Sequence, residues 1–240
     1  MNKPIVYVRA GHSGIDPKTG LYLTMRDEHS KFYKHTNGKP YHENGFFYEG
    51  VSNRLIVDKF IKLGRETGFE VVQIHHPYQD INLRLACGYA NKHYSVHGKG
   101  RPAIFLDIHS NAGKARGLAL LYYPGYVKDG IAINAPSIKG KKLAEDMAQE
   151  LNPVWLNEGA KYGTTPVRAG WIYNVKTGKP IAPYYMVQHT NMPAIIIENG
   201  FFDNEQDADL LMQDCFQDKL AQGILMGCLR NFGYETKIKI

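Results

Sequence analysis

The hydrophobic positions of the chain fall into short uninterrupted runs, separated by stretches in which apolar residues recur with a helical period. Three runs stand out, at residues 5–8, 103–106 and 194–197, and each reads as a strand. Residues 69–74 and 118–123 show weaker strand patterns. The apolar runs therefore predict a sheet of at least five strands distributed along the whole chain.

Helical spacing of apolar residues occupies much of the sequence between these runs. Four helices are predicted, over about residues 52–68, 82–94, 137–151 and 214–232. Ser137 is a candidate N-cap of the third helix, and Pro153 is expected to end it. The alternation of strands and helices predicts the α/β class, with a mostly parallel twisted sheet flanked by helices. In such folds functional side chains gather at the C-terminal ends of the strands.

Two segments lack a clear period. Residues 15–48 are rich in Gly, Lys, Tyr, His and Asn, and we interpret them as a long loop insertion over the surface. Residues 153–192 mix Pro, Gly, Tyr, Trp and Thr without a pattern that predicts an element. A long loop in a compact domain is often functional, so the first segment is of interest for the site.

Length and composition fit a single domain. The chain has 240 residues, of which 43% are hydrophobic and 22% charged, so one α/β domain with a substantial core is expected over residues 1–240. No apolar stretch approaches the roughly 18 residues of a membrane span, and no membrane insertion is expected. The first residues lack the apolar core and the cleavage site of a signal peptide, which predicts synthesis in the cytoplasm.

The formal charge of +6 and a pI of about 9.0 favour an anionic partner such as a bacterial envelope or nucleic acid. Nucleic acid is disfavoured, because the chain has no recognisable reading helix or aromatic strand motif. Two basic clusters, at 139–142 and 237–239, are expected to be solvated surface. Cys87, Cys215 and Cys228 have no C-x-x-C spacing and are expected to be buried apolar residues.

Side chains capable of metal binding or acid–base chemistry follow the three strongest strand patterns. They are His12, His109 and Glu198, and they can meet in one crevice if the strands are parallel neighbours. Glu49 opens the first predicted helix and would complete a set of two His and one Glu. That is the ligand set of a catalytic zinc ion with one position left for water. The pattern therefore suggests a hydroxide usable at neutral pH.

Glu198 has a separate role in this hypothesis. Partial desolvation at the end of a buried strand would raise its pKa toward the working range, so it could move a proton from an attacking water to a leaving nitrogen. Asn53, Asp107 and Asn111 are candidates to orient the ligands through hydrogen bonds.

Plainer interpretations stay open for single residues. His12 could be a surface histidine in a Gly-rich turn, and Glu49 a first-turn carboxylate stabilised by the helix dipole. His75 and His76 also follow a strand and are rival metal ligands. Neighbouring residues of an extended chain point to opposite sides, however, and rarely bind one ion together.

Four segments together resemble the zinc-dependent N-acetylmuramoyl-L-alanine amidases, which cleave the amide between the lactyl group of muramic acid and L-alanine in peptidoglycan. The resemblance rests on residues 11–14 (GHSG), 49–53 (EGVSN), 107–112 (DIHSNA) and 193–204 (PAIIIENGFFDN). One such segment is a weak signal, whereas four in this order on the expected elements are specific. The match extends over nearly the whole chain.

The resemblance implies a single catalytic amidase domain. Zn²⁺ would be held by His12, Glu49 and His109, with Glu198 as the catalytic carboxylate and peptidoglycan as the substrate. A monomer is expected. This sequence departs from the family pattern at three positions that bear on geometry and rate: Ser13 for Gly, Asp107 for Ser and Asn199 for Thr. The segment between His12 and Glu49 is longer than is common in the family and is a candidate wall of the substrate groove.

The lack of a signal peptide and of a repeat-type wall-binding module predicts a phage lysin of the endolysin type, acting on the wall of a bacterial host. A bacterial enzyme exported by another route, or a delivered toxin, would have the same sequence features. Two other function classes also stay open. One is a zinc peptidase or carboxypeptidase acting on cell-wall peptides, and the other is a non-catalytic peptidoglycan-binding protein on the same scaffold.

Overall fold

The computed structural model describes residues 3–23, 31–128, 131–174 and 176–234, and a six-stranded sheet forms its centre. In spatial order the strands are β4 (Glu70–Gln73), β1 (Ile5–Ala10), β5 (Ala103–Asn111), β12 (Ala194–Phe201), β6 (Leu118–Tyr122) and β9 (Val167–Ala169). All neighbours pair in parallel except β12 and β6, which are antiparallel. The prediction of a mostly parallel sheet is therefore confirmed.

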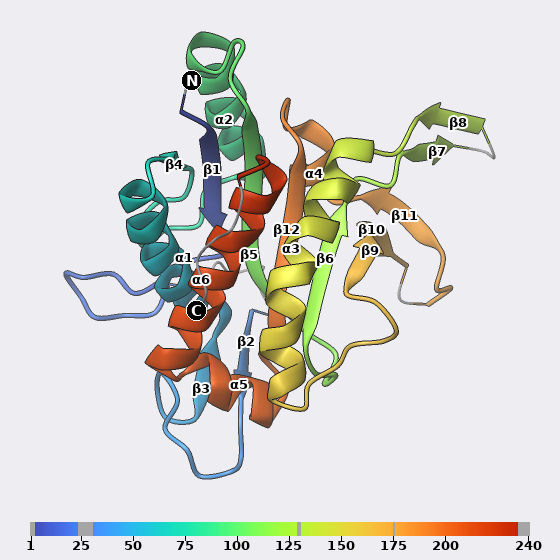
Figure 1. Cartoon of the computed structure of the whole chain (residues 1–240). Coiled ribbons are helices and arrows are strands. Elements are labelled where there is room, and N and C mark those ends of the chain that lie inside the picture. The colour runs from blue at the N-terminus through green and yellow to red at the C-terminus, as the bar shows by residue number, and fades with distance from the viewer. Residues whose placement is uncertain (1–2, 24–30, 129–130, 175, 235–240) are drawn as a thin grey trace.

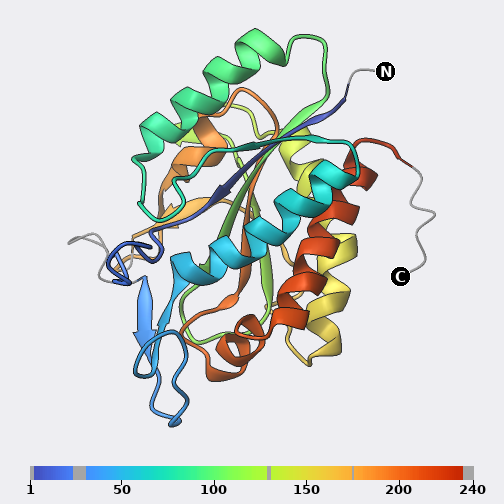
Figure 2. The ribbon, with the colours of Figure 1, turned by 90° about the vertical axis from the view of Figure 1, so that its left-hand side faces the viewer.

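Helices cover both faces of this sheet (Figures 1 and 2). One face carries α1 (Glu49–Glu66), α3 (Ile138–Asn157) and α6 (Asp214–Asn231), and the other carries α2 (Leu83–His97) and α4 (Tyr185–His189). The short α5 (Glu205–Leu211) follows β12. Among the helices of the described ranges, none has both the length and the apolar character needed to cross a membrane. The result is a three-layer α/β/α domain.

Strand alternation divides the core into two clusters. Val6 and Val8 of β1 pack with α1, α3 and α6, whereas Ile5 and Tyr7 pack on the α2 and α4 side. The same division holds for β5 and β12, because successive side chains of a strand point to opposite faces. Each central strand is thus buried on both faces, which explains the uninterrupted apolar runs in the sequence.

The helix α3 corrects one prediction, because it continues through Pro153 to Asn157. A proline within a helix costs about 3 kcal/mol, since it removes a backbone hydrogen bond and crowds the preceding turn. Leu151 and Trp155, on either side of it, are fully buried. Each such burial contributes roughly 1.5–3 kcal/mol, which is enough to offset the cost.

The two segments without a period contain short elements that the sequence did not predict. These are β2 (Phe32–Lys34) paired with β3 (Phe46–Tyr48), β10 (Trp171–Tyr173) paired with β11 (Pro180–Pro183), and also β9 and α4. A further hairpin joins β7 (Tyr126–Lys128) to β8 (Ile131–Asn134). The 15–48 segment is not only a surface loop, since Tyr41 and Phe47 belong to the core. Residues 24–30 of this segment lie outside the described residues.

Cys87 and Cys228 are buried, as expected, but the prediction is wrong for Cys215, which is exposed. Cys215 lies in the first turn of α6, just before the helix reaches the core at Phe216. In the basic cluster at 139–142, Lys141 and Lys142 form ion pairs with residues four positions along α3. The cluster at 237–239 lies outside the described residues.

Candidate metal centre

The alternation that separates the two cores also selects the side chains of the site. Arg9 continues the α2-facing side of β1, Asp107 and His109 continue that side of β5, and Glu198 continues it on β12. All four lie at or near the carboxyl ends of three neighbouring strands, where an open α/β sheet forms its binding crevice. Sequence order and sheet order together thus place polar groups at one edge of an otherwise apolar sheet.

Two close backbone approaches bring His12 and Glu49 to the same edge. His12 follows β1 with a positive φ of 62°, a conformation that costs a non-glycine residue on the order of 1 kcal/mol or more. A side chain at Gly11 would overlap the His109 ring, and one at Gly50 would overlap the backbone of Ser13. Glycine at these two positions therefore lets the turn after β1 pack against β5 and against the start of α1.

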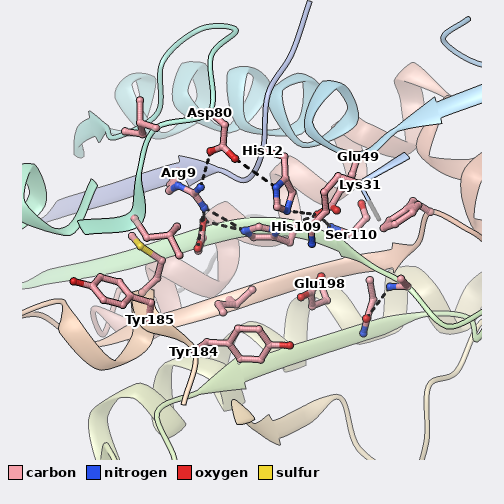
Figure 3. A pocket seen from close by; sticks show the side chains of 18 of the residues that line it. Arg9, His12, Lys31, Glu49, Asp80, His109, Ser110, Tyr184, Tyr185 and Glu198 are labelled. Atoms are coloured by element: carbon pink, nitrogen blue, oxygen red, sulfur yellow. Dashed lines mark hydrogen bonds and ion pairs between the residues drawn. The ribbon is translucent and has the colours of Figure 1, made fainter. Parts of the chain in front are cut away.

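His12, Glu49 and His109 form one cluster whose potential ligand atoms all lie within 4.8 Å of one another. Glu49 Oε1 is 3.5 Å from His12 Nε2 and 3.0 Å from His109 Nδ1. The two imidazole rings meet edge to face, with centroids 4.8 Å apart (Figure 3). The structure thus brings together the three residues that the sequence singled out as metal ligands.

Two orphaned oxygens indicate that this donor set fits a cation. Oε2 of Glu49 and Oε2 of Glu198 are buried and have no hydrogen-bond partner among the described residues. Buried carboxylate oxygens are normally paired, because leaving one unpaired costs more than the 1–3 kcal/mol of a neutral group. Two imidazoles and a carboxylate are also the donors that zinc takes in catalytic sites.

The electrostatics of the cluster also favour a bound cation. Burial alone would raise the pKa of Glu49, but His12 and His109 lower it to about 2. Burial alone would lower the pKa of His109, but Asp107 and Glu49 raise it to about 10. The cluster therefore attracts positive charge strongly, and a proton and a metal ion compete for the same nitrogen.

Glu198 lies on the opposite wall of the cavity from His12 and Glu49, on the same side as Tyr184 (Figure 3). In the sheet Glu198 pairs with His109, and only 8% of its surface is exposed. Burial raises its pKa to about 7; His109 opposes this shift and Glu49 adds to it. A carboxyl group with such a pKa can accept and return a proton near neutral pH.

Two of the three predicted orienting residues contact the cluster. Asn53 Nδ2 donates to Glu49 Oε1 at 3.4 Å and to the Gly11 carbonyl at 3.3 Å. Asp107 Oδ1 lies 3.4 Å from His109 Nε2. Asn111 lines the cavity, but the hydrogen bond recorded for its side-chain oxygen comes from the amide of Ala112.

Sequence reasoning missed three groups around the cluster: Arg9, Asp80 and the Ser110 amide. The Ser110 amide donates to Glu49 Oε1 at 3.1 Å. Arg9 and Asp80 form an ion pair beside the histidines. A lone arginine at the end of a buried apolar strand was a readable signal, whereas nothing in the sequence distinguishes Asp80 from other loop carboxylates.

The rival histidines do not join the cluster. His75 Nδ1 accepts a hydrogen bond from the Ala10 amide at 3.1 Å. His76 Nδ1 accepts from the amides of Tyr78 and Gln79. Both rings therefore accept hydrogen bonds from backbone amides. Neither belongs to the group of described residues that could hold a metal.

The cavity around the cluster has a volume of about 580 Å³. Its polar wall includes the cluster, Arg9 and Asp80, and its other lining residues include Ile81, Leu83, Tyr184, Tyr185, Met186 and Ile196. A cavity of this size holds a drug-sized portion of a substrate. The arrangement can bind an extended polar molecule with an apolar part and present one of its bonds to the cluster and to Glu198.

The fold and the site define an α/β protein with a candidate metal centre in a cleft at the C-terminal ends of its parallel strands. The family model for N-acetylmuramoyl-L-alanine amidase matches residues 6–230, and the chain belongs to this family.

Similar proteins include N-acetylmuramoyl-L-alanine amidase CwlM of Bacillus licheniformis, 30% identical over 128 residues, which are 53% of this chain and 40% of that protein. The endolysin of Bacillus phage SPP1 is 33% identical over 66 residues, 27% of this chain and 24% of that protein. The matches thus span less than half the length of these relatives. The catalytic domain of CwlV from Bacillus (Paenibacillus) polymyxa var. colistinus has the same fold, with a TM-score of 0.66, 18% identity and coverage of 96% of this chain and 99% of that chain.

Proposed function

We propose that this protein hydrolyses the amide bond between N-acetylmuramic acid and L-alanine in peptidoglycan, with Zn²⁺ held by His12, Glu49 and His109. The observation that carries the proposal is the convergence of these three residues in one buried cluster, across a cavity from Glu198, in a chain of the amidase family. The basic net charge also favours approach to a polyanionic wall.

When bound, a zinc ion would polarise the substrate carbonyl and lower the pKa of a water molecule. The chain's own residues do the rest. Glu198 takes a proton from the attacking water and delivers it to the amide nitrogen of L-alanine, so that this nitrogen leaves as an amine. Asn53 and the Ser110 amide hold Glu49 in place through hydrogen bonds to Oε1.

The test is digestion of purified peptidoglycan by the zinc-loaded protein, with mass spectrometry of the soluble products. We expect stem peptides with a free L-alanine N-terminus. Shortened stem peptides would instead identify a peptidase, and intact sacculi that retain the protein would identify a binding module.

The matched control is Glu198→Gln, which preserves the shape of the side chain but removes the base. We expect this variant to keep its zinc and its fold while losing roughly 10²- to 10⁴-fold in turnover. A Glu198→Gln variant that cleaves at the normal rate would show that another group moves the proton.

We further propose that the protein acts as a monomeric phage lysin on a host wall. The similarity to the SPP1 endolysin supports this role, but the similarity to Bacillus amidases supports a bacterial enzyme as well. Expression in the cytoplasm of a test bacterium, with and without a membrane-permeabilising protein, tests the role. Lysis only when both are present is the expected result, and lysis by the amidase alone would contradict it.

A further inference from the structure

A buried guanidinium joins two carboxylates beside the candidate metal centre. Arg9 is 2% exposed and lies at the end of β1. Its Nη1 donates to Asp107 Oδ1 at 2.9 Å, and its Nη2 donates to Asp80 Oδ1 at 3.1 Å (Figure 3). Asp107 comes from β5 and Asp80 from the segment before α2, so one side chain connects three parts of the fold.

Each of these carboxylates faces one of the candidate histidine ligands. Asp80 Oδ2 lies 3.6 Å from His12 Nδ1, and Asp107 Oδ1 lies 3.4 Å from His109 Nε2. The opposite ring nitrogens, His12 Nε2 and His109 Nδ1, face Glu49 Oε1. In both rings, therefore, one nitrogen faces Glu49 and the other faces a carboxylate held by Arg9.

This arrangement has a direct consequence for the tautomers. A neutral imidazole carries one N–H and one lone pair, and a carboxylate accepts the N–H. With a metal on the nitrogen that faces Glu49, the N–H would lie on the opposite nitrogen, beside Asp80 in His12 and beside Asp107 in His109. His109 Nε2 lies 3.4 Å from the acceptor Asp107 Oδ1 and 3.3 Å from the donor Arg9 Nη1, so this pair fixes the position of the ring rather than the place of its proton.

Only a forked side chain can hold both carboxylates in these positions. The planar guanidinium presents donors in two directions, whereas a lysine ammonium is a point charge on a flexible stem. Without the guanidinium, Asp107 would lose its closest cationic partner, and no cation would lie between the two carboxylates.

We propose that Arg9 is a positioning residue that fixes the orientation of both His12 and His109 through Asp80 and Asp107. The inference rests on the proposed metal-dependent function and adds to it the group that organises the ligands. It assigns Arg9 no contact with the substrate.

The experiment measures metal affinity rather than turnover. Apo wild-type protein, Arg9→Lys and Arg9→Gln are titrated with Zn²⁺ and with Co²⁺ in competition with a chelator, and the visible spectrum of each Co²⁺ complex is recorded. Loss of such an orienting partner typically costs 10- to 100-fold in metal affinity. We expect this loss for both variants, with a changed Co²⁺ spectrum.

The control is Arg230→Lys, which makes the same substitution in the ion pair between Arg230 of α6 and Glu150 of α3, away from the cluster. Its metal affinity should equal that of the wild type. A double-mutant cycle of Arg9→Gln with Asp80→Asn should be strongly non-additive, because both variants act on the same histidine. A purely structural Arg9 would give additive losses of stability and no change in the spectrum.

The outcomes separate this inference from the proposed function. If wild-type protein binds no zinc, the proposed function fails and the inference fails with it. If the wild type binds zinc and cleaves peptidoglycan but folded Arg9 variants have unchanged affinity and spectra, only the inference is overturned. If the Arg9 variants do not fold, Asp80→Asn decides, because 13% of its side chain is exposed and it keeps the same shape. Roughly tenfold weaker zinc binding by Asp80→Asn supports the inference, and unchanged binding overturns it.

Discussion

Gly50 lies close to the turn after β1, and this contact decides whether alanine at position 50 raises or lowers the stability of the protein. A Cβ added at Gly50 would overlap the carbonyl oxygen of Ser13 and lie 2.9 Å from both Ser13 C and Ser13 N. Non-bonded carbon contacts begin at about 3.5 Å. In Gly50→Ala, the first turn of α1 and the turn that carries His12 must therefore separate, by a shift on the order of 1 Å.

This shift acts on Glu49, the preceding residue. The hydrogen bond from the Ser110 amide to Glu49 Oε1 is 3.1 Å long, so a 1 Å shift takes it past the limit of a hydrogen bond. A lost hydrogen bond to a charged group costs about 1.5–3 kcal/mol, and a catalytic group misplaced by 1 Å costs roughly 100-fold in rate. We expect Gly50→Ala to be less stable by this amount, to bind zinc more weakly and to lose at least 100-fold in kcat.

Helix propensity alone predicts the opposite sign, since alanine stabilises a helix by about 1 kcal/mol over glycine. The control is Gly88→Ala in α2, where an added methyl group meets no atom within 4 Å. It should be slightly more stable than the wild type and fully active. Urea unfolding, chelator competition and peptidoglycan digestion measure the three effects. A Gly50→Ala protein with the stability and rate of Gly88→Ala would refute the argument.

The remaining predictions concern the metal ion and the stability of the protein at acidic pH. Exhaustive chelation should abolish peptidoglycan cleavage and added zinc should restore it, so cleavage by metal-free protein would contradict the proposed chemistry. His109→Ala should lower the zinc content per chain, and an unchanged stoichiometry would remove His109 from the ligand set. Burial, assisted by Arg54 and Arg9, lowers the pKa of His75 to about 3. The unfolded chain, with an ordinary pKa near 6.5, then binds the extra proton, and the free energy of unfolding falls as the pH drops below 6.5, by about 1.4 kcal/mol per unit. His75→Asn, which keeps an acceptor for the Ala10 amide, should lose this part of the slope in urea titrations at pH 5 and 7; an identical slope would show that His75 does not cause it.

The long elements could be predicted from the sequence because their apolar patterns report burial directly. The central strands have side chains buried on both faces, and α1 begins at Glu49, the residue expected to open this helix. The hairpin of β2 and β3 could not be found in this way, because three-residue strands are too short to show a period. The end of α3 was mispredicted since the burial of Trp155, a tertiary effect, outweighs a local rule about proline.

The candidate ligands were predictable because a polar group after a buried strand needs a partner, and His109 and Glu198 were conspicuous for that reason. The ion pair between Arg9 and Asp80 could not be predicted in this way. It depends on the path of residues 74–82, which turns back over β1 and carries Asp80 to Arg9. Such a path leaves no periodic trace in the sequence, so only the folded chain shows that one arginine lies between two carboxylates.

The position of β12 bears on how the protein is made. This strand lies between β5 and β6 in the sheet, although both of those strands are synthesised well before residues 194–201. Until Phe201 has left the ribosome, β5 and β6 each keep an unpaired edge, and unpaired edges are prone to intermolecular pairing. Glu198 arrives in this same last strand of the sheet. A chain that stops before residue 194 therefore lacks both the strand that joins β5 to β6 and the group proposed to move the proton.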